Sequence, residues 1–166
     1  MRPMSNAAMA PPVAVRVADA ADLSALVGMV EAFLRETSYG TVIEADRRVI
    51  TANVGRFIDG EIGRMFVATR DGQPVGLLAA TVYVNLLTGR RDGSEIVWWV
   101  DPKDRRSGAG MALLKVAEAW MCEQGAEASH LVAWNDRLVR VYGRMGYLKM
   151  ETVCRKALTT KESPCR

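Results

Sequence analysis

A short loop that contains two glycines is the first segment whose residues could do chemistry. It reads RRSGAGM over residues 105–111 and stands between a strand-like run, EIVWWV, and an apolar helix-forming stretch. The first N–H groups of a helix lack partners and carry the positive end of its dipole. Because Gly108 and Gly110 have no side chains, a phosphate group could approach several of these donors. The pattern predicts a pyrophosphate cradle, to which Arg105 and Arg106 add positive charge. The alternative is a tight turn in which the glycines only relieve strain.

The loop does not match the two commonest nucleotide-binding motifs. No Lys-Ser or Lys-Thr pair follows Gly110, as a P-loop requires, and Leu113 stands where a dinucleotide-binding loop has its third glycine. A nucleoside triphosphate and a dinucleotide are therefore disfavoured as ligands.

A second segment, NDRLVRVYGRMGY, contains an asparagine, a tyrosine and a Gly-Tyr pair within thirteen residues. Asn135 stands at the start of a helix-forming stretch and Tyr142 follows seven residues later, before Gly146 and Tyr147. Asparagine is a preferred N-cap residue, so a capping role alone is enough to explain Asn135. Tyr142 could equally be an amphipathic residue packed under a strand.

Composition limits the class of protein. The chain has 166 residues, 49% of them hydrophobic and 25% charged, with a net charge of +3. This charge is too small to predict a nucleic-acid partner, although it suits an anionic small ligand. No apolar run is long enough for a membrane span, and no signal peptide is expected. The three cysteines and single histidine have no metal-ligand spacing, which predicts no metal site and reduced thiols in the cytoplasm.

Hydrophobic periodicity and turn residues predict the elements that position these segments. We expect an α/β (α+β) fold in the order β-α-α-β-β-β-α-β-α-β, with a mixed, mostly antiparallel sheet flanked by helices. Residues 1–12 are expected to form a disordered leader, 13–158 a single domain and 159–166 a flexible tail. The strands are expected at 13–18, 64–70, 73–87, 95–100, 130–134 and 147–158, and the helices from Asp19 or Asp22 to near Glu36, and at 44–58, 111–123 and 135–145.

Both motifs, in this order of elements, resemble the GNAT superfamily of acetyl-coenzyme A-dependent N-acetyltransferases. RRSGAG is similar to that family's [QR]xxGx[GA] loop, and NDRLVRVYGRMGY is similar to its N-x(6)-Y-x(3)-G-[FY] segment. The resemblance covers about residues 13 to 158. This sequence departs from the family at Val139, where relatives usually carry alanine, and at Ser107, where they often carry glycine or lysine. Neither departure removes a main-chain donor from the loop.

The resemblance implies that acetyl-coenzyme A is the cosubstrate and that no metal is needed. Its pantetheine arm would pair with the main chain of the fourth strand as an added strand does, which requires the fourth and fifth strands to separate. Trp98 and Trp99 point to opposite faces of that strand, so at most one could line the acceptor side. The residues implied in coenzyme binding are Trp98, Trp99, Val100, Arg105, Arg106, Ser107, Gly108, Ala109, Gly110, Met111, Asn135 and Tyr142.

Tyr142 and Glu95 are the residues to which the resemblance assigns chemistry. The phenol of Tyr142 would protonate or stabilise the departing thiolate of coenzyme A. Glu95 opens the strand EIVWWV, which resembles the EIVF-type strand of histone-acetylating relatives, where a glutamate is the base. Its side chain is expected to share a face with Val97 and Trp99. The alternatives are a solvated glutamate at a strand end, with ordered water as the base.

The acceptor site is expected near the connection between the first two helices. This connection spans residues 36–44, where Glu36, Tyr39 and Glu44 could line a pocket together with residues 82–87. The sequence does not identify the acceptor, which could be a small amine, an amino-sugar antibiotic, a polyamine or a protein amine. A non-catalytic acyl-coenzyme A sensor and an interaction domain without a ligand remain alternatives, and a homodimer is possible.

Overall fold

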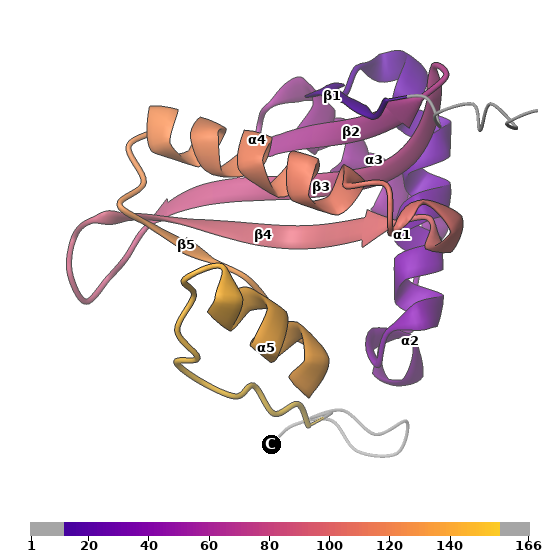
Figure 1. The fold of residues 1–166 in the computed structure, drawn as a ribbon. Helices are drawn as coiled ribbons and strands as arrows, with labels where there is room; N and C mark the ends of the chain where they lie inside the picture. The colour runs from indigo at the N-terminus through magenta and orange to yellow at the C-terminus, as the bar shows by residue number, and fades with distance from the viewer. Residues whose placement is uncertain (1–11, 157–166) are drawn as a thin grey trace, which may run out of the picture. The chain divides into compact units, whose positions relative to one another are not determined.

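The computed structural model describes residues 12–156, so most of the expected leader and all of the expected tail lie outside the described residues. The chain divides into two compact units, and the boundary in the sequence falls after Val132. The first holds the sheet and most of the helices, and the second holds one helix. Figure 1 labels the elements of both units.

The first unit contains five strands in the predicted order, but the strand predicted at 130–134 is displaced: β5 spans Ala128–His130, and residues 131–134 form no strand. Asp71 and Gly72 form the two-residue turn between β2 and β3, with φ values of 50° and 72°. A short helix, α2 (Tyr39–Val42), was not expected. Strand β4 (Arg91–Val100) starts four residues earlier than predicted, because the turn before it is confined to residues 85–90. The elements are β1 (Ala14–Val17), η1 (Ala20–Asp22), α1 (Leu23–Glu36), α2 (Tyr39–Val42), α3 (Arg47–Asp59), β2 (Arg64–Arg70), β3 (Gln73–Val84), β4 (Arg91–Val100), η2 (Pro102–Asp104), α4 (Ala109–Glu123) and β5 (Ala128–His130).

The sheet follows the order β1-β2-β3-β4-β5 and is antiparallel except at its last pair, where β5 runs parallel to β4. This parallel pair follows from the long connection through α4, because a parallel neighbour requires a crossover and an antiparallel one needs only a turn. The mixed, mostly antiparallel sheet confirms the predicted fold class.

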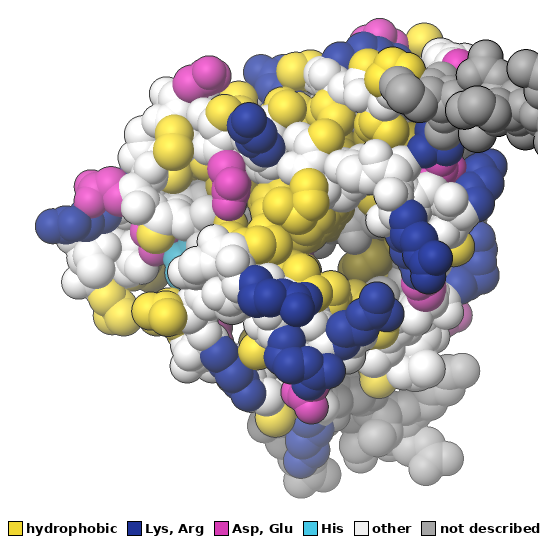
Figure 2. All heavy atoms as spheres, in the orientation of Figure 1, with side chains coloured by type: hydrophobic (Ala, Val, Ile, Leu, Met, Phe, Trp, Pro, Cys, Tyr) yellow, Lys and Arg dark blue, Asp and Glu magenta, His cyan; other side chains and the backbone are white. Residues whose placement is uncertain are grey.

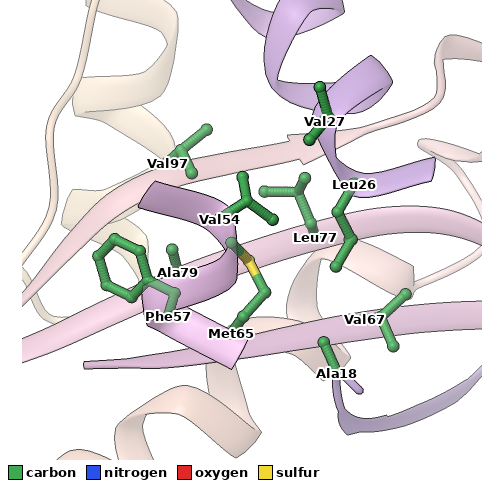
Figure 3. Close-up of a cluster of buried hydrophobic side chains, with 10 residues drawn as sticks. All are labelled: Ala18, Leu26, Val27, Val54, Phe57, Met65, Val67, Leu77, Ala79 and Val97. Atoms are coloured by element: carbon green, nitrogen blue, oxygen red, sulfur yellow. The ribbon is translucent and has the colours of Figure 1, made fainter. Parts of the chain in front are cut away.

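Helices cover both faces of the sheet. Helices α1 and α3 pack on one face, and α4 lies across the other, as Figure 1 shows. Successive side chains of a strand point to opposite faces of the sheet, so alternate residues of each strand face α1 and α3 on one side and α4 on the other. Figure 3 shows the layer under α1 and α3, in which Val54 and Phe57 meet Met65, Leu77 and Val97. On the opposite face Phe66 packs edge-on against Trp120 of α4, with ring centroids 6.1 Å apart.

The second unit contains α5 (Asp136–Arg144) followed by irregular chain. A last strand was predicted at 147–158, but residues 147–156 form no strand and the final two lie outside the described residues. The prediction was wrong for 147–156 because it rested on composition, whereas a strand also needs a neighbour to accept its main-chain hydrogen bonds. Leu148 and Met150 of this segment are exposed.

Candidate active site

The loop between β4 and α4 is anchored at its first turn. Asp104 is buried and accepts a hydrogen bond in an ion pair with Arg70 at the end of β2, with 2.7 Å between Nη1 and Oδ1. The carboxylate of Asp101 accepts the N–H of Lys103 at 3.1 Å, which caps η2. The protein itself therefore holds the start of the loop in place.

The N-terminus of α4 has donors that no side chain caps. Gly108 is the N-cap and has no side chain to offer. Ser107 Oγ accepts the N–H of Ala109 at 3.2 Å. Within residues 12–156, no protein acceptor takes the N–H of Gly110 or Met111. A helix start of this kind favours an anion.

Backbone conformation explains the glycine at 108, whereas packing does not explain the glycine at 110. Gly108 has a φ of 86°, a left-handed conformation that costs any other residue about 1 kcal/mol or more. At Gly110, by contrast, an added Cβ would lie 3.5 Å from Cζ2 of Trp98, which is an ordinary contact. Since glycine inside a helix is less stable than alanine by about 1 kcal/mol, packing does not explain Gly110.

Strands β4 and β5 separate next to this loop. They pair only from Asp92 to Ser94, so β4 continues through Val100 without β5 beside it. Asp101 donates its N–H to the carbonyl of Val75 in β3 at 2.9 Å. Because main-chain direction alternates along a strand, the N–H and C=O groups of Val100 and Trp98 point away from β3. Those of Trp99 point toward β3, so its main chain is not available to a ligand at this edge, contrary to the expectation for Trp99.

Arg105 is bound to the protein rather than free for a ligand. Its Nε donates to the carbonyl of Val100 at 3.1 Å, and its Nη2 donates to Glu36 at the end of α1. Trp99 Nε1 donates to the same carboxylate at 3.0 Å. Together these bonds, that of Arg105 first, lower the pKa of Glu36. Glu36 was expected to line an acceptor pocket, but it instead ties the loop to α1.

Arg106 differs from its neighbour because it is exposed and forms no ion pair with any residue between 12 and 156. Within the second unit, Figure 2 shows Lys and Arg side chains gathered over the region that α5 occupies in Figure 1. A free guanidinium beside uncapped N–H groups adds to the attraction for an anion.

A β-bulge decides where Glu95 points. Ala79 pairs with Val97 and Ala80 with Glu95, so Ile96 is an extra residue in β4. Glu95 therefore shares a face with Trp98, and the expectation that it shares one with Val97 and Trp99 was wrong. The bulge reverses the alternation that a regular strand would have.

Glu95 is enclosed where β4 and β5 separate. Glu95 is 7% exposed, and its Oε1 accepts the N–H of Val132 at 3.1 Å. Burial raises the pKa of this carboxyl to about 7, because the charged form loses hydration, and the bond from Val132 offsets only part of the loss. A carboxyl with a pKa near neutrality can accept and release a proton at physiological pH.

In the second unit, α5 presents the asparagine and tyrosine of the second motif. Asn135 is the N-cap of α5, and its Oδ1 accepts the N–H of Leu138 at 2.9 Å. Tyr142 lies seven residues on, about two helical turns, so both residues are on one side of the helix. Tyr142 is buried, and its ring centroid is 6.1 Å from that of Tyr147.

Residues 28–147 match the model of the acetyltransferase (GNAT) family. The chain belongs to this family. The match spans the bulge in β4, the loop before α4 and the motif in α5, and it confirms the resemblance that the two motifs indicated.

Solved structures share the fold of this GNAT chain at low sequence identity. An aminoglycoside N-acetyltransferase in complex with coenzyme A is 14% identical, with a TM-score of 0.73 over 90% of this chain and 97% of its own. An aminoglycoside acetyltransferase from an uncultured soil metagenomic sample, in complex with sisomicin, is 17% identical, with a TM-score of 0.66 over 90% and 97%. A Trypanosoma brucei acetyltransferase is 20% identical, with a TM-score of 0.69 over 88% and 99%. No curated protein sequence matches the chain.

An apolar cavity of about 290 Å³ lies between α1, α2, α3 and the sheet of this GNAT chain. Of the residues expected near an acceptor, Tyr39 lines it, whereas Glu44 and residues 82–87 do not. Several lining residues lie on the apolar faces of α1 and α3, and nothing in the sequence signals that Ile96 bulges into this space. The lining residues are Val30, Phe33, Leu34, Tyr39, Ile50, Asn53, Val54, Phe57, Met65, Ile96 and Val97.

Residues 12–156 contain neither a candidate membrane span nor a candidate metal site. No helix there is long and apolar enough to cross a membrane. No group of three or more His, Cys, Asp and Glu side chains in that range could hold a metal ion.

Proposed function

We propose that this GNAT protein transfers an acetyl group from acetyl-coenzyme A to a primary amine of a small molecule or protein by direct attack. The observation that carries the proposal is the N-terminus of α4, where a glycine N-cap and two N–H groups without protein acceptors lie beside the separated edge of β4. The coenzyme complex of a structural neighbour with the same fold supports the choice of ligand.

The loop and the strand edge would hold different parts of the coenzyme. The main-chain N–H groups of Gly110 and Met111 would bind the pyrophosphate, and Arg106 would add a charge-assisted contact. The main chain of Trp98 and Val100 would pair with the pantetheine arm. Since Arg105 already donates to the carbonyl of Val100, its role is to position this edge, and the arm would have to share or replace that hydrogen bond.

The cosubstrate supplies the acetyl group as a thioester. In the proposed step the nitrogen of the neutral amine forms a bond to the carbonyl carbon, and the bond from that carbon to sulfur breaks. The carboxylate of Glu95, directly or through a water molecule, takes the proton that the amine loses. The phenol of Tyr142 donates a hydrogen bond or its proton to the sulfur, which leaves as a thiol. Glu95 has then gained a proton and Tyr142 has lost one. Both residues return to their starting protonation states by exchanging protons with water.

Catalysis is favoured over a sensor that only binds acyl-coenzyme A. The buried carboxyl of Glu95 carries a free-energy cost when it is charged, and a protein that only binds the coenzyme has no use for that cost. Release of free thiol from acetyl-coenzyme A, measured across classes of amine, tests the choice. Thiol release that no amine accelerates, together with a thermal shift on adding coenzyme A, would leave the sensor as the better description.

Replacing Arg106 with alanine is expected to weaken binding of coenzyme A by about 5- to 30-fold, since a charge-assisted contact to phosphate is lost. The melting temperature without ligand should stay unchanged, because Arg106 makes no ion pair within the described part of the chain. Calorimetric titration at low and high salt provides the measurement, and the difference should shrink as salt screens the charge. Arg48→Ala, on the exposed side of α3, is the matched control. Equal affinities for the two variants would contradict a phosphate site at this loop.

A further inference from the structure

We propose that the acceptor is a monoamine with an apolar, ring-sized body, and that this body fills the cavity between α1, α2, α3 and β4. The inference rests on the proposed function, which leaves the acceptor unidentified. It selects an arylalkyl or branched-alkyl monoamine as the acceptor, in place of the polyamines, amino sugars and protein amines that the sequence leaves open.

The chemistry of the lining selects the apolar body. None of the lining residues carries a charge at neutral pH, and only Tyr39 and Asn53 offer polar atoms. The ring of Tyr39 also packs against Phe33, with centroids 5.8 Å apart, so its face contributes to the apolar surface. Four of the lining side chains are members of the buried cluster in Figure 3, so the cavity opens directly from the core: Val54, Phe57, Met65 and Val97.

The same lining excludes a polycation. A second ammonium group would lose its hydration in the cavity with no carboxylate to replace it. Glu36 cannot serve, since Arg105 and Trp99 both donate to its carboxylate. Glu44 is exposed and lies outside the lining. The acceptor therefore carries its amine at the end of the molecule that stays outside the apolar space.

The bulge in β4 connects the cavity to the proposed site of chemistry. Ile96 is the extra residue of the bulge, lines the cavity and is still 52% exposed. Its neighbour Glu95 points to the other face, toward the separation of β4 and β5. An amine that projects from the cavity past Ile96 reaches the strand edge along which the thioester would lie. The exposed apolar surface at Ile96 also becomes covered when the cavity fills.

The volume sets the size of the apolar body. A dry cavity of about 150 Å³ in another protein holds a benzene ring. The cavity of about 290 Å³ here accommodates one ring with a short chain, or a branched alkyl group of similar size. Two fused sugar-sized rings with their hydration would not fit.

The first test compares acceptors that differ only in the body. 2-Phenylethylamine and 2-aminoethanol both present a primary amine on a two-carbon chain, and 1,4-diaminobutane adds a second charge. We expect kcat/KM for 2-phenylethylamine to exceed that for each of the others by about 10- to 100-fold, from burial of the ring. Comparable values for all three, with normal thiol release, would overturn the inference and leave the proposed function intact.

The second test fills the cavity. Val30→Phe places a ring in the space, and Val49→Phe makes the same change on α3, where Val49 is 55% exposed and outside the lining. Calorimetry with 2-phenylethylamine, with and without saturating coenzyme A, should show binding to the wild type and to Val49→Phe. It should show at least about 10-fold weaker binding to Val30→Phe. Thermal melts of both variants report whether the fold is kept.

A surface variant provides a test that does not depend on repacking the core. Asn53 is exposed at the cavity, so Asn53→Asp adds a carboxylate without changing the size of the side chain. We expect kcat/KM for 1,4-diaminobutane to rise by about 5- to 20-fold in this variant, because its second ammonium gains a partner. Binding of coenzyme A that stays normal while all three amines fail to bind would overturn the inference. Loss of coenzyme binding itself would instead count against the proposed function.

Discussion

Replacing Tyr142 with phenylalanine is expected to lower kcat by about 100-fold or more and to change the KM for acetyl-coenzyme A by less than about threefold. The phenol acts on the sulfur only as the carbon–sulfur bond breaks, so its loss affects the transition state more than coenzyme binding. Phenylalanine keeps the ring, which is buried against Tyr147, and removes only the hydroxyl. Steady-state rates of thiol release over a range of acetyl-coenzyme A concentrations provide the measurement.

Tyr147→Phe is the matched control for this experiment. Tyr147 belongs to the same unit, its ring is 6.1 Å from that of Tyr142, and either phenylalanine or tyrosine fits the family pattern there. This variant should keep kcat within about twofold of the wild type. An unchanged kcat in Tyr142→Phe, or an equal loss in both variants, would remove the Tyr142 phenol from the mechanism.

Replacing Glu95 with glutamine is expected to abolish the acidic limb of the pH–rate profile and to lower kcat/KM at neutral pH by about 100-fold. In the wild type the ionised carboxylate is the active form, so activity should rise with pH through about 7, the value to which burial raises the pKa of Glu95. Glutamine cannot take a proton. A limb that persists unaltered in the variant would assign the base to another group or to water.

The pH dependence of the free energy of unfolding should report the ionisation of Glu95 independently of activity. The pKa of Glu95 is about 7 in the folded chain, against an ordinary value of 4.5, so between these values the unfolded chain releases the proton first. Ionisation therefore favours unfolding as pH rises, and the penalty is complete above the folded pKa. From this carboxyl alone, the free energy of unfolding of the wild type should fall by about 2 kcal/mol between pH 5.5 and 8.

The difference between variants isolates this contribution. Glu95→Gln lacks the charge, and its Oε1 can still accept the N–H of Val132, so its stability relative to the wild type should increase over that pH range. Glu123→Gln, at the exposed end of α4, is the control and should follow the wild type. Urea unfolding at both pH values checks the result. Parallel curves for Glu95→Gln and the wild type would mean that the carboxyl is not held in a low-dielectric site.

Local features of the fold could be predicted from the sequence because each depends on a few adjacent residues. The Asp71-Gly72 turn, the apolar stripes of α1 and α3, and the capping of α5 by Asn135 are of this kind. The loop before α4 is another, since a glycine N-cap needs only its own backbone. The family was equally accessible, because both motifs are contiguous in the chain.

Only the tertiary structure decided which way the key side chains point and what they contact. The bulge at Ile96 is a shift in the pairing of β4 with β3, and it places Glu95 on the face opposite to the one that regular alternation predicts. The hydrogen bond from Arg105 to Glu36 joins residues 69 positions apart. The predicted strand at 147–156 failed for the same reason, as no neighbour pairs with it in the described chain. Register, long-range ion pairs and strand partners depend on contacts between distant segments, which a pattern of neighbouring residues does not encode.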